Sequence, residues 1–500
     1  MQWFHQLQRS QHRKKLIRYS FIALATIAMI LLGLGRMPAL AQTARHYSEL
    51  EFEPLPEIQL PDYSRFELDN GIVVYLLEDH ELPLVGGTAM FHTGERLEPN
   101  DKVGLASITG SVMRSGGTVQ HPPDELNLLL EQRAASVETG IDATTGTASF
   151  SALTEDLTEV FGLFAEVIRQ PAFPQDRVDL LKSQIRGGIA RRNDDPDEVA
   201  GREFQKLVYG TQSPYARTVE YATLDNISRD DILGFYQQYF HPNNMILGIV
   251  GDFESEEMRS LIEAAFSDWQ PNPNLEAQLE LPEVAQAQTG IFLVDQPQLT
   301  QSYIQIGHLG GQLNNPDHAA LTVVNEVLNG FGGRLTNEVR SRQGLAYVVY
   351  AYWNPRFDFP GTFIGGGQTR TDATVPFIQS VLAEIERIRT APISEAELTR
   401  AKDSVLNAFI FNFQDPGQIL ARLMRYEYYD YPADFIFQYQ RQVEETTIED
   451  VQQAAQEHLK PENIVTLVVG NAAAIQPPLN SLGSNVEVTQ IDITIPEPQG

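Results

Sequence analysis

The chain carries one pattern twice, HPNNMILGIVG at residues 241–251 and KPENIVTLVVG at residues 460–470. Upstream of each copy a hydroxyl N-cap, Ser228 or Thr447, opens an amphipathic helix that the proline ends. A strand rich in β-branched residues follows and finishes at a glycine. The two glycines, Gly251 and Gly470, are 219 positions apart. A period this long indicates duplication of a whole domain, because solenoid repeats are much shorter.

The residues before the first copy predict both strands and helices. Asn70-Gly71 lies between two β-rich runs within residues 66–77, which is the strongest short signal for a β-hairpin. The pattern further predicts a strand over 84–92 and amphipathic helices over 125–135, 157–169 and 175–192. Each half is therefore expected to be an α+β unit with helices packed on a sheet.

Proline and polar residues mark the boundaries of these units. Residues 42–61 are predicted to be an extended lead-in, 62–269 the first domain, 270–289 a linker and 290–475 the second domain. The tail, residues 476–500, is rich in proline and β-branched residues. The sequence leaves open whether this tail adds a strand or stays loose.

The N-terminus has the layout of a secretory signal peptide over residues 1–41. Arg13, Lys14, Lys15 and Arg18 precede an apolar run over 21–35, and Ala39-Leu40-Ala41 offers a cleavage site. A periplasmic or otherwise extracytoplasmic protein is expected. The alternative is an uncleaved membrane anchor, although the apolar run is shorter than the roughly 20 residues of a spanning helix.

Composition excludes several classes of protein. The 500 residues include 36 Lys plus Arg against 66 Asp plus Glu, a formal net charge of −30, and 42% hydrophobic residues. This balance argues against disorder and against binding to nucleic acid or anionic membranes, which negative charge repels. Cysteine is absent, so disulfides, thiolate nucleophiles and cysteine-based metal sites are excluded.

The stretch NGFGGRLTNEVRSRQGLAY at residues 329–347 closely resembles the C-terminal half of the M16 (insulinase, or pitrilysin-like) peptidases. The first half agrees in order, with GERLE at 94–98, GLA at 104–106 and DDP at 194–196. The resemblance spans residues 62–475 and is strongest to the short two-domain, processing-peptidase-like group. It implies two homologous M16-type (LuxS/M16-like metalloenzyme) α+β domains, each a mixed or antiparallel sheet covered by helices.

The resemblance also implies that the family's zinc site is lost. Active members carry His-x-x-Glu-His on a helix and a distal Glu, which together bind zinc and activate water. The matching positions here are Ser107, Gly110, Ser111 and Gly187. Neutral hydroxyls are poor zinc ligands and glycine has no side chain to move a proton, so no metal is expected in this chain.

The histidines offer no replacement site in the sequence, because no two lie three to five residues apart on a predicted helix. His121, near Asp124 and Glu125, comes closest, but Pro122-Pro123 makes this segment a turn and a helix start. His92 and His308 lie in strand-like runs and are interpreted as sheet histidines whose hydrogen bonds are satisfied.

The resemblance implies a retained second part of the site at Arg340 and Tyr347. Arg340 would hold backbone carbonyls of a peptide, and Tyr347 would donate a hydrogen bond to the scissile carbonyl as negative charge develops. Gly330, Gly332 and Gly333 occupy the place of a substrate-touching glycine loop. Without the resemblance, Arg340 is a solvated cation at a helix end and Tyr347 the first packed residue of a strand.

These features favour a noncatalytic subunit of an exported heterodimeric M16-type peptidase. Its partner would be a catalytic M16 subunit that brings His-x-x-Glu-His and zinc, and its substrates would be peptides. The alternatives are a peptide-binding or assembly module with no part in hydrolysis, and a stand-alone metallopeptidase with unrecognised ligands. Whether the chain itself is an enzyme is left open by the sequence.

Overall fold

The computed structural model describes residues 58, 60–275, 283–483 and 487–497, and residues 59–500 form one compact unit. The predicted signal peptide and almost all of the extended lead-in lie outside the described residues. Within the described part, no helix is both long enough and apolar enough to span a membrane.

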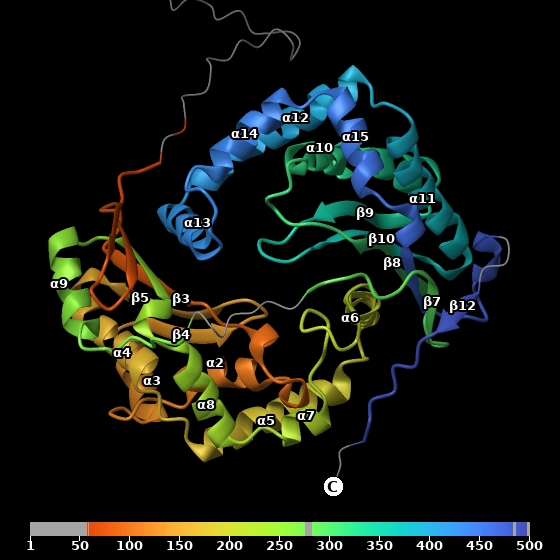
Figure 1. Cartoon of the computed structure of the whole chain (residues 1–500). Helices are drawn as coiled ribbons and strands as arrows, with labels where there is room; N and C mark the ends of the chain where they lie inside the picture. Colours follow the sequence, from red (N-terminus) through yellow and green to blue (C-terminus); the bar gives the residue numbers. More distant parts are fainter. Residues whose placement is uncertain (1–57, 59, 276–282, 484–486, 498–500) are drawn as a thin grey trace, which may run out of the picture. The chain divides into compact units, whose positions relative to one another are not determined.

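The first half is built on a six-stranded mixed sheet of order β1-β2-β6-β3-β5-β4 (Figure 1). β2 and β6 run parallel and the other neighbours are antiparallel. The predicted hairpin is confirmed, with Gly71 at φ 92° in the turn between β1 and β2. The strands are β1 Ser64–Glu67, β2 Val73–Glu78, β3 Leu84–Phe91, β4 Ser136–Ile141, β5 Gly146–Leu153 and β6 Met245–Gly251.

Helices pack on this sheet around a large buried core that includes Phe91, Phe161 and Phe164. The predicted helix 157–169 is confirmed at both ends, but the helix predicted over 125–135 starts earlier, at Pro123, and ends at Glu131. It stops early because the chain turns through Ala134, at φ 47°, to enter β4. The helices are α2 Leu105–Ser115, α3 Pro123–Glu131, α4 Leu157–Arg169, α5 Gln175–Arg191, α6 Pro196–Tyr209, α7 Tyr221–Asp225, α8 Arg229–Tyr239 and α9 Ser255–Phe266.

The second half repeats this plan with the sheet order β12-β7-β11-β8-β10-β9. Both halves are thus α+β units with a six-stranded mixed sheet, as expected. Its elements are β7 Gly290–Asp295, β8 Gln301–Leu309, β9 Ala346–Asn354, β10 Thr362–Arg370, β11 Val465–Gly470, β12 Val488–Gln490, α10 His318–Asn329, α11 Thr374–Thr390, α12 Glu395–Phe409, α13 Pro416–Tyr428, α14 Phe435–Glu445 and α15 Ile448–His458.

The repeated motif has the same local structure in both halves. Ser228 and Thr447 each form a capping box, with Asp231 and Asp450 respectively, at the start of α8 and α15. The edge strand beside the parallel pair differs, because the hairpin strand β1 supplies it in the first half and the tail strand β12 in the second. The tail therefore adds a strand.

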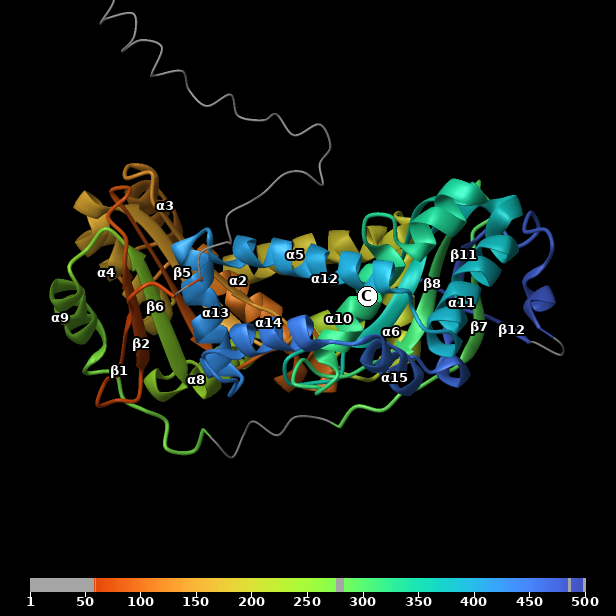
Figure 2. The same ribbon diagram turned by 90° about the horizontal axis from the view of Figure 1, so that it is seen from above.

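Each half also covers the other half's sheet with one helix. Ile419, Leu420, Leu423 and Met424 of α13 are buried against β2, β3 and β6, and α6 packs on β8 and β11 through residues such as Phe204. Figure 2 shows α13 beside the first sheet and α6 beside the second. Burying each of these side chains contributes roughly 1.5–3 kcal/mol. The amphipathic patterns predict both helices' apolar faces, but the sequence does not show that they cross to the other half.

Gly365-Gly366-Gly367 lies inside β10 with neighbours paired on both sides. A Cβ on Gly366 would lie 2.0 Å from the carbonyl oxygen of Ile304, and one on Gly367 would lie 2.1 Å from that of Val348. These glycines therefore permit the close approach of β8 and β9 to β10.

Candidate functional site

The helix α2 carries three of the four positions at which the family's zinc site would be built. Ser107 and Ser111 are half-buried and one helical turn apart, while Gly110 is fully buried against β4. A Cβ at Gly110 would lie 2.5 Å from the backbone nitrogen of Ile141 and 2.7 Å from the carbonyl carbon of Gly140. β4 thus occupies the space that a general base at this position would need, and the residues present do not fit a zinc ion.

The fourth position, Gly187, lies on α5, which packs against α2. A Cβ there would meet no atom within 4 Å. α5 therefore has room for a side chain at this position, but the glycine offers no ligand atom.

A buried ion pair, unexpected from the sequence, lies beside Ser107. Glu98 and Arg217 line a cavity of about 170 Å³ together with Ser107, and their side chains are 1% and 8% exposed. Glu98 accepts hydrogen bonds from the backbone N–H groups of Gly104 and Ala106 at the start of α2. Burial raises the pKa of Glu98 to about 7, despite these bonds and Arg217. Glu98 is the last residue of the GERLE motif at 94–98. The sequence does not reveal its partner, because Arg217 is 119 residues away along the chain.

Gly110→Ala and Gly187→Ala should have opposite effects on stability. The methyl group at Gly110 would force α2 and β4 apart, at a cost of about 1–3 kcal/mol. At Gly187 the methyl group meets open space inside a helix and should stabilise by about 0.5–1 kcal/mol. Denaturant midpoints of the two variants test this. If Gly110→Ala unfolds at the wild-type denaturant midpoint, β4 does not pack closely against α2 at this position.

Arg340 and Tyr347 lie on either side of a tight turn, and the structure brings them into direct contact. The Arg340 Cζ atom is 4.5 Å from the centroid of the Tyr347 ring, a cation–π arrangement. Arg340 belongs to a π-helical segment, Thr336–Arg342, and Tyr347 is the second residue of β9. Gly344 turns the chain between them at φ 63°.

The pair is exposed, although the backbone that carries it is firmly held. Tyr347 is 79% exposed, so it is not the packed strand residue that its sequence position alone suggested. Leu335 and Val339 are fully buried beneath the π-helical segment, and the backbone N–H of Leu345 donates to the carbonyl of Val339. A π-helical turn at this place is a common sign of a functional segment.

The predicted glycine loop follows α10 directly. Gly330 ends that helix, the backbone N–H of Gly333 donates to the carbonyl of Gly330, and Gly332 has φ 76°. The loop presents Phe331 to solvent, with 98% of its surface exposed. A Cβ on Gly333 would clash with the carbonyl of Leu328, so close packing also requires a glycine at this position.

Further apolar side chains are exposed along β9, the edge strand of the second sheet. Val348 is 46% and Tyr352 43% exposed. Edge strands with unpaired backbone groups and apolar side chains are surfaces on which extended peptides add. We refer to Tyr347, Val348 and Tyr352 as the β9 strip.

A cavity of about 790 Å³ lies elsewhere. It is walled by the first sheet, α6, α13 and the loop 356–359, with aromatic residues such as Tyr215 and Phe359. An ion pair between Arg96 and Asp358, at 2.6 Å, joins the two halves next to it. Arg340, Tyr347 and the glycine loop do not line this cavity.

The histidines follow the sequence interpretation in part. His308 is fully buried in β8, where its Nδ1 lies 2.9 Å from the carbonyl of Leu309 and its Nε2 accepts from the backbone N–H of Lys460. His121 pairs with Glu166, not with the nearby Asp124 or Glu125. Asp317, Glu457 and His458 lie together in the structure, with their side-chain N and O atoms within 4.8 Å of one another. The sequence did not reveal this proximity because Asp317 and His458 are 141 residues apart.

Comparisons with known proteins agree with this architecture. Residues 75–218 match the family model described as insulinase (peptidase family M16), and residues 226–405 match the model of the peptidase M16 inactive domain. Among solved structures, the M16 inactive domain from Pseudomonas fluorescens has a TM-score of 0.73 and 24% identity, covering 83% of this chain and all of that one. A protease from Helicobacter pylori has a TM-score of 0.70 and 19% identity, covering 82% of this chain and all of that one.

Curated relatives have mixed names. An uncharacterized zinc protease of Streptomyces coelicolor is 22% identical over 55% of this chain, and the match spans 61% of that relative. An uncharacterized zinc protease of Rickettsia felis is 24% identical, over 67% of this chain and 80% of that one. The non-peptidase homolog YmxG of Helicobacter pylori is 23% identical, over 79% of this chain and 90% of that one.

The fold defines a class of protein with two duplicated α+β halves, each on a six-stranded mixed sheet. The chain belongs to the M16 peptidase family, with an N-terminal and a C-terminal M16 domain.

Proposed function

We propose that this chain is the noncatalytic subunit of an exported heterodimeric M16-type zinc peptidase, in which it binds the substrate and stabilises the transition state. The observation that carries the proposal is the exposed Arg340–Tyr347 pair on a rigidly anchored turn. An exposed tyrosine and arginine in contact, above a buried base, are available to a ligand or to a second subunit. The close packing of β4 against Gly110 also supports the proposal, because it leaves no room for a general base on α2. Zinc and the general base would then come from the partner subunit.

The two side chains have complementary chemistry for peptide hydrolysis. The guanidinium of Arg340 is a permanent cation with several N–H donors, suited to holding backbone carbonyls of an extended peptide. The hydroxyl of Tyr347 donates a hydrogen bond to the scissile carbonyl oxygen, and this bond strengthens as negative charge develops. The partner subunit brings His-x-x-Glu-His, the zinc ion and the general base.

The β9 strip gives the substrate a surface on which to lie. An extended peptide that pairs with β9 would cover Val348 and Tyr352 and bring its backbone past Tyr347. The chain's net charge of −30 favours basic peptides over acidic ones.

A second candidate is a peptide-binding or assembly module that takes no part in hydrolysis. The absence of fitting zinc ligands on α2 and the relative named as a non-peptidase homolog favour it. In that case Arg340 and Tyr347 would contribute to binding alone.

Peptide cleavage by the purified chain, by a co-exported M16 relative with His-x-x-Glu-His, and by their mixture distinguishes these functions. We expect turnover in the mixture at least about a hundredfold above either chain alone, because neither has a whole site. Cleavage by this chain alone would contradict the proposal. A stable mixture no more active than the relative alone would favour the binding module.

A further inference from the structure

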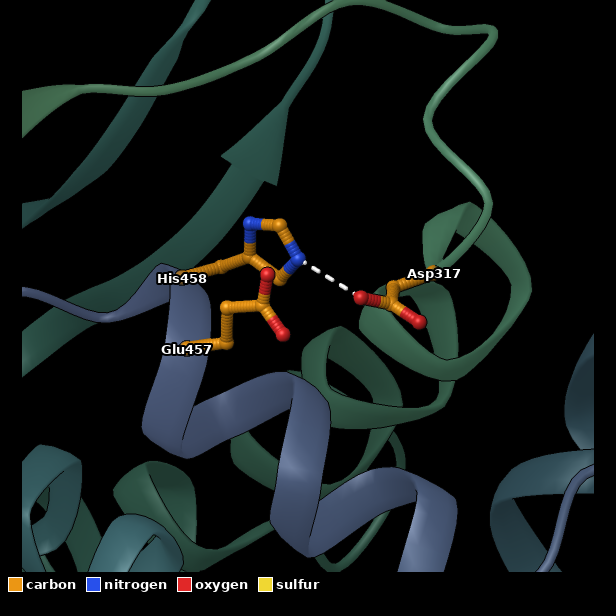
Figure 3. A group of neighbouring side chains, drawn as sticks. All are labelled: Asp317, Glu457 and His458. Carbon is orange, nitrogen blue, oxygen red and sulfur yellow. Dashed lines mark hydrogen bonds and ion pairs between the residues drawn. The ribbon is translucent and has the colours of Figure 1, made fainter.

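A second group of chemically suited side chains lies in the other half from α2, where α10 begins and α15 ends. Asp317 precedes α10, and Glu457 and His458 are at the end of α15. Their ligand atoms all lie within 4.8 Å of one another, and His458 Nε2 is 2.8 Å from Asp317 Oδ2. Figure 3 shows the Glu457 carboxylate beside the His458 ring, on the side that faces Asp317.

Packing holds the histidine in place while the carboxylates stay accessible. The His458 side chain is 13% exposed, and its ring meets Trp353 edge-on at 5.2 Å between centroids. Asp317 is 36% exposed and Glu457 is exposed. A fixed imidazole beside two solvent-facing carboxylates leaves a route for an ion and for water.

The local charges favour a cation. Within the described ranges, neither Asp317 nor Glu457 has a lysine or arginine within salt-bridge distance, and His458 is the one basic partner of Asp317. Two neighbouring carboxylates repel each other, and a neutral imidazole does not compensate them. A divalent cation would balance both charges and use the Nε2 lone pair.

We propose that Asp317, Glu457 and His458 bind a zinc ion. Imidazole nitrogen and carboxylate oxygen both suit zinc, at bond lengths of about 2.0–2.2 Å that place tetrahedral ligand atoms roughly 3.3 Å apart. The exposed Glu457 side chain closes the remaining gap by rotating, and water takes the fourth position. In the neutral ring, the single proton that Nε2 donates to Asp317 moves through water to Nδ1, and the ion then takes the Nε2 lone pair and the freed Asp317 oxygen.

The site would tie the end of α15 to the start of α10. These helices already pack together through residues such as Val324 and Val451, and α10 leads directly into Gly330. Zinc would therefore stabilise the helix that supports the glycine loop. This inference stands apart from the proposed subunit role, because the site lies far along the chain from α2 and needs no partner.

Calorimetric titration of the chelator-treated protein with Zn²⁺ tests the proposal. We expect one saturable site that His458→Ala abolishes and that Glu457→Gln weakens at least about tenfold. Glu457 is exposed, so this second variant keeps the fold if His458→Ala does not. Ni²⁺, which quenches nearby indoles, should quench Trp353 fluorescence in the wild type and not in His458→Ala.

His80→Ala is the matched control. His80 also lies between two carboxylates, but Asp252 contacts its Nδ1 and Glu78 its Nε2, so these atoms do not converge on one point. This variant should bind zinc as the wild type does. Failure of the wild type to bind Zn²⁺ overturns the proposal, and so does binding that both His458→Ala and Glu457→Gln leave unchanged.

Discussion

Tyr347→Phe is expected to lower kcat of the reconstituted peptidase by about 10²–10³ while leaving KM within about twofold. In the proposed function the phenolic hydroxyl acts on charge that exists only in the transition state, so its loss should not weaken substrate binding. The ring stays in place, which preserves the cation–π contact with Arg340. Steady-state kinetics of the mixed subunits measure both constants.

Two further variants separate this role from packing. Arg340→Ala should raise KM, because it removes donors to the bound peptide backbone. Tyr352→Phe removes the hydroxyl of another exposed tyrosine of β9 but keeps the ring that the peptide would cover, so kcat should be unchanged. Thermal midpoints of all three variants should stay near the wild type, because these side chains are on the surface. Full turnover in Tyr347→Phe would exclude the hydroxyl from the chemistry.

Much of the fold could be predicted because its signals are local. The Asn70-Gly71 turn, the ends of α4 and the two capping boxes each depend on residues within a few positions of one another. The partners of α6 and α13 could not be predicted. An amphipathic pattern shows which face of a helix is buried, but not which sheet buries it.

The candidate functional site likewise could be predicted only where its residues are close together in the sequence. Arg340 and Tyr347 are identified from a local motif, and their side chains meet because Gly344 turns the chain between them. The exposure of Tyr347 did not follow, because a tyrosine that begins a strand is usually packed. The pair Glu98–Arg217 depends on contacts between residues far apart in the chain, which periodicity does not report.

The stability of the protein should fall steeply as the pH drops from 6.5 to 4.5. Burial lowers the pKa of His92, His308 and His318 to about 4 and raises that of Glu98 to about 7. Near pH 5.5 the unfolded chain thus binds three protons that the folded chain does not, and the folded chain keeps one on Glu98. For these four groups the net difference of about two protons lowers the free energy of unfolding by roughly 2.5 kcal/mol for each pH unit of acidification near pH 5.5, as denaturant midpoints across this range would show.

The variant His308→Gln measures the contribution of one of these histidines to the pH dependence of stability. The Nε2 atom of the neutral imidazole accepts a hydrogen bond from the backbone N–H of Lys460. A proton on Nε2 would break this bond, because two N–H donors would then face each other in a buried place. Glutamine does not titrate, and the variant should lose about 1.4 kcal/mol per pH unit of the slope between pH 6.5 and 4.5, whatever its stability at pH 7. His80→Gln should not reduce the slope, because its hydrogen bond to Asp252 raises the pKa of the exposed His80 and acts in the opposite sense. An unchanged slope in His308→Gln would mean that this histidine is protonated within the folded sheet.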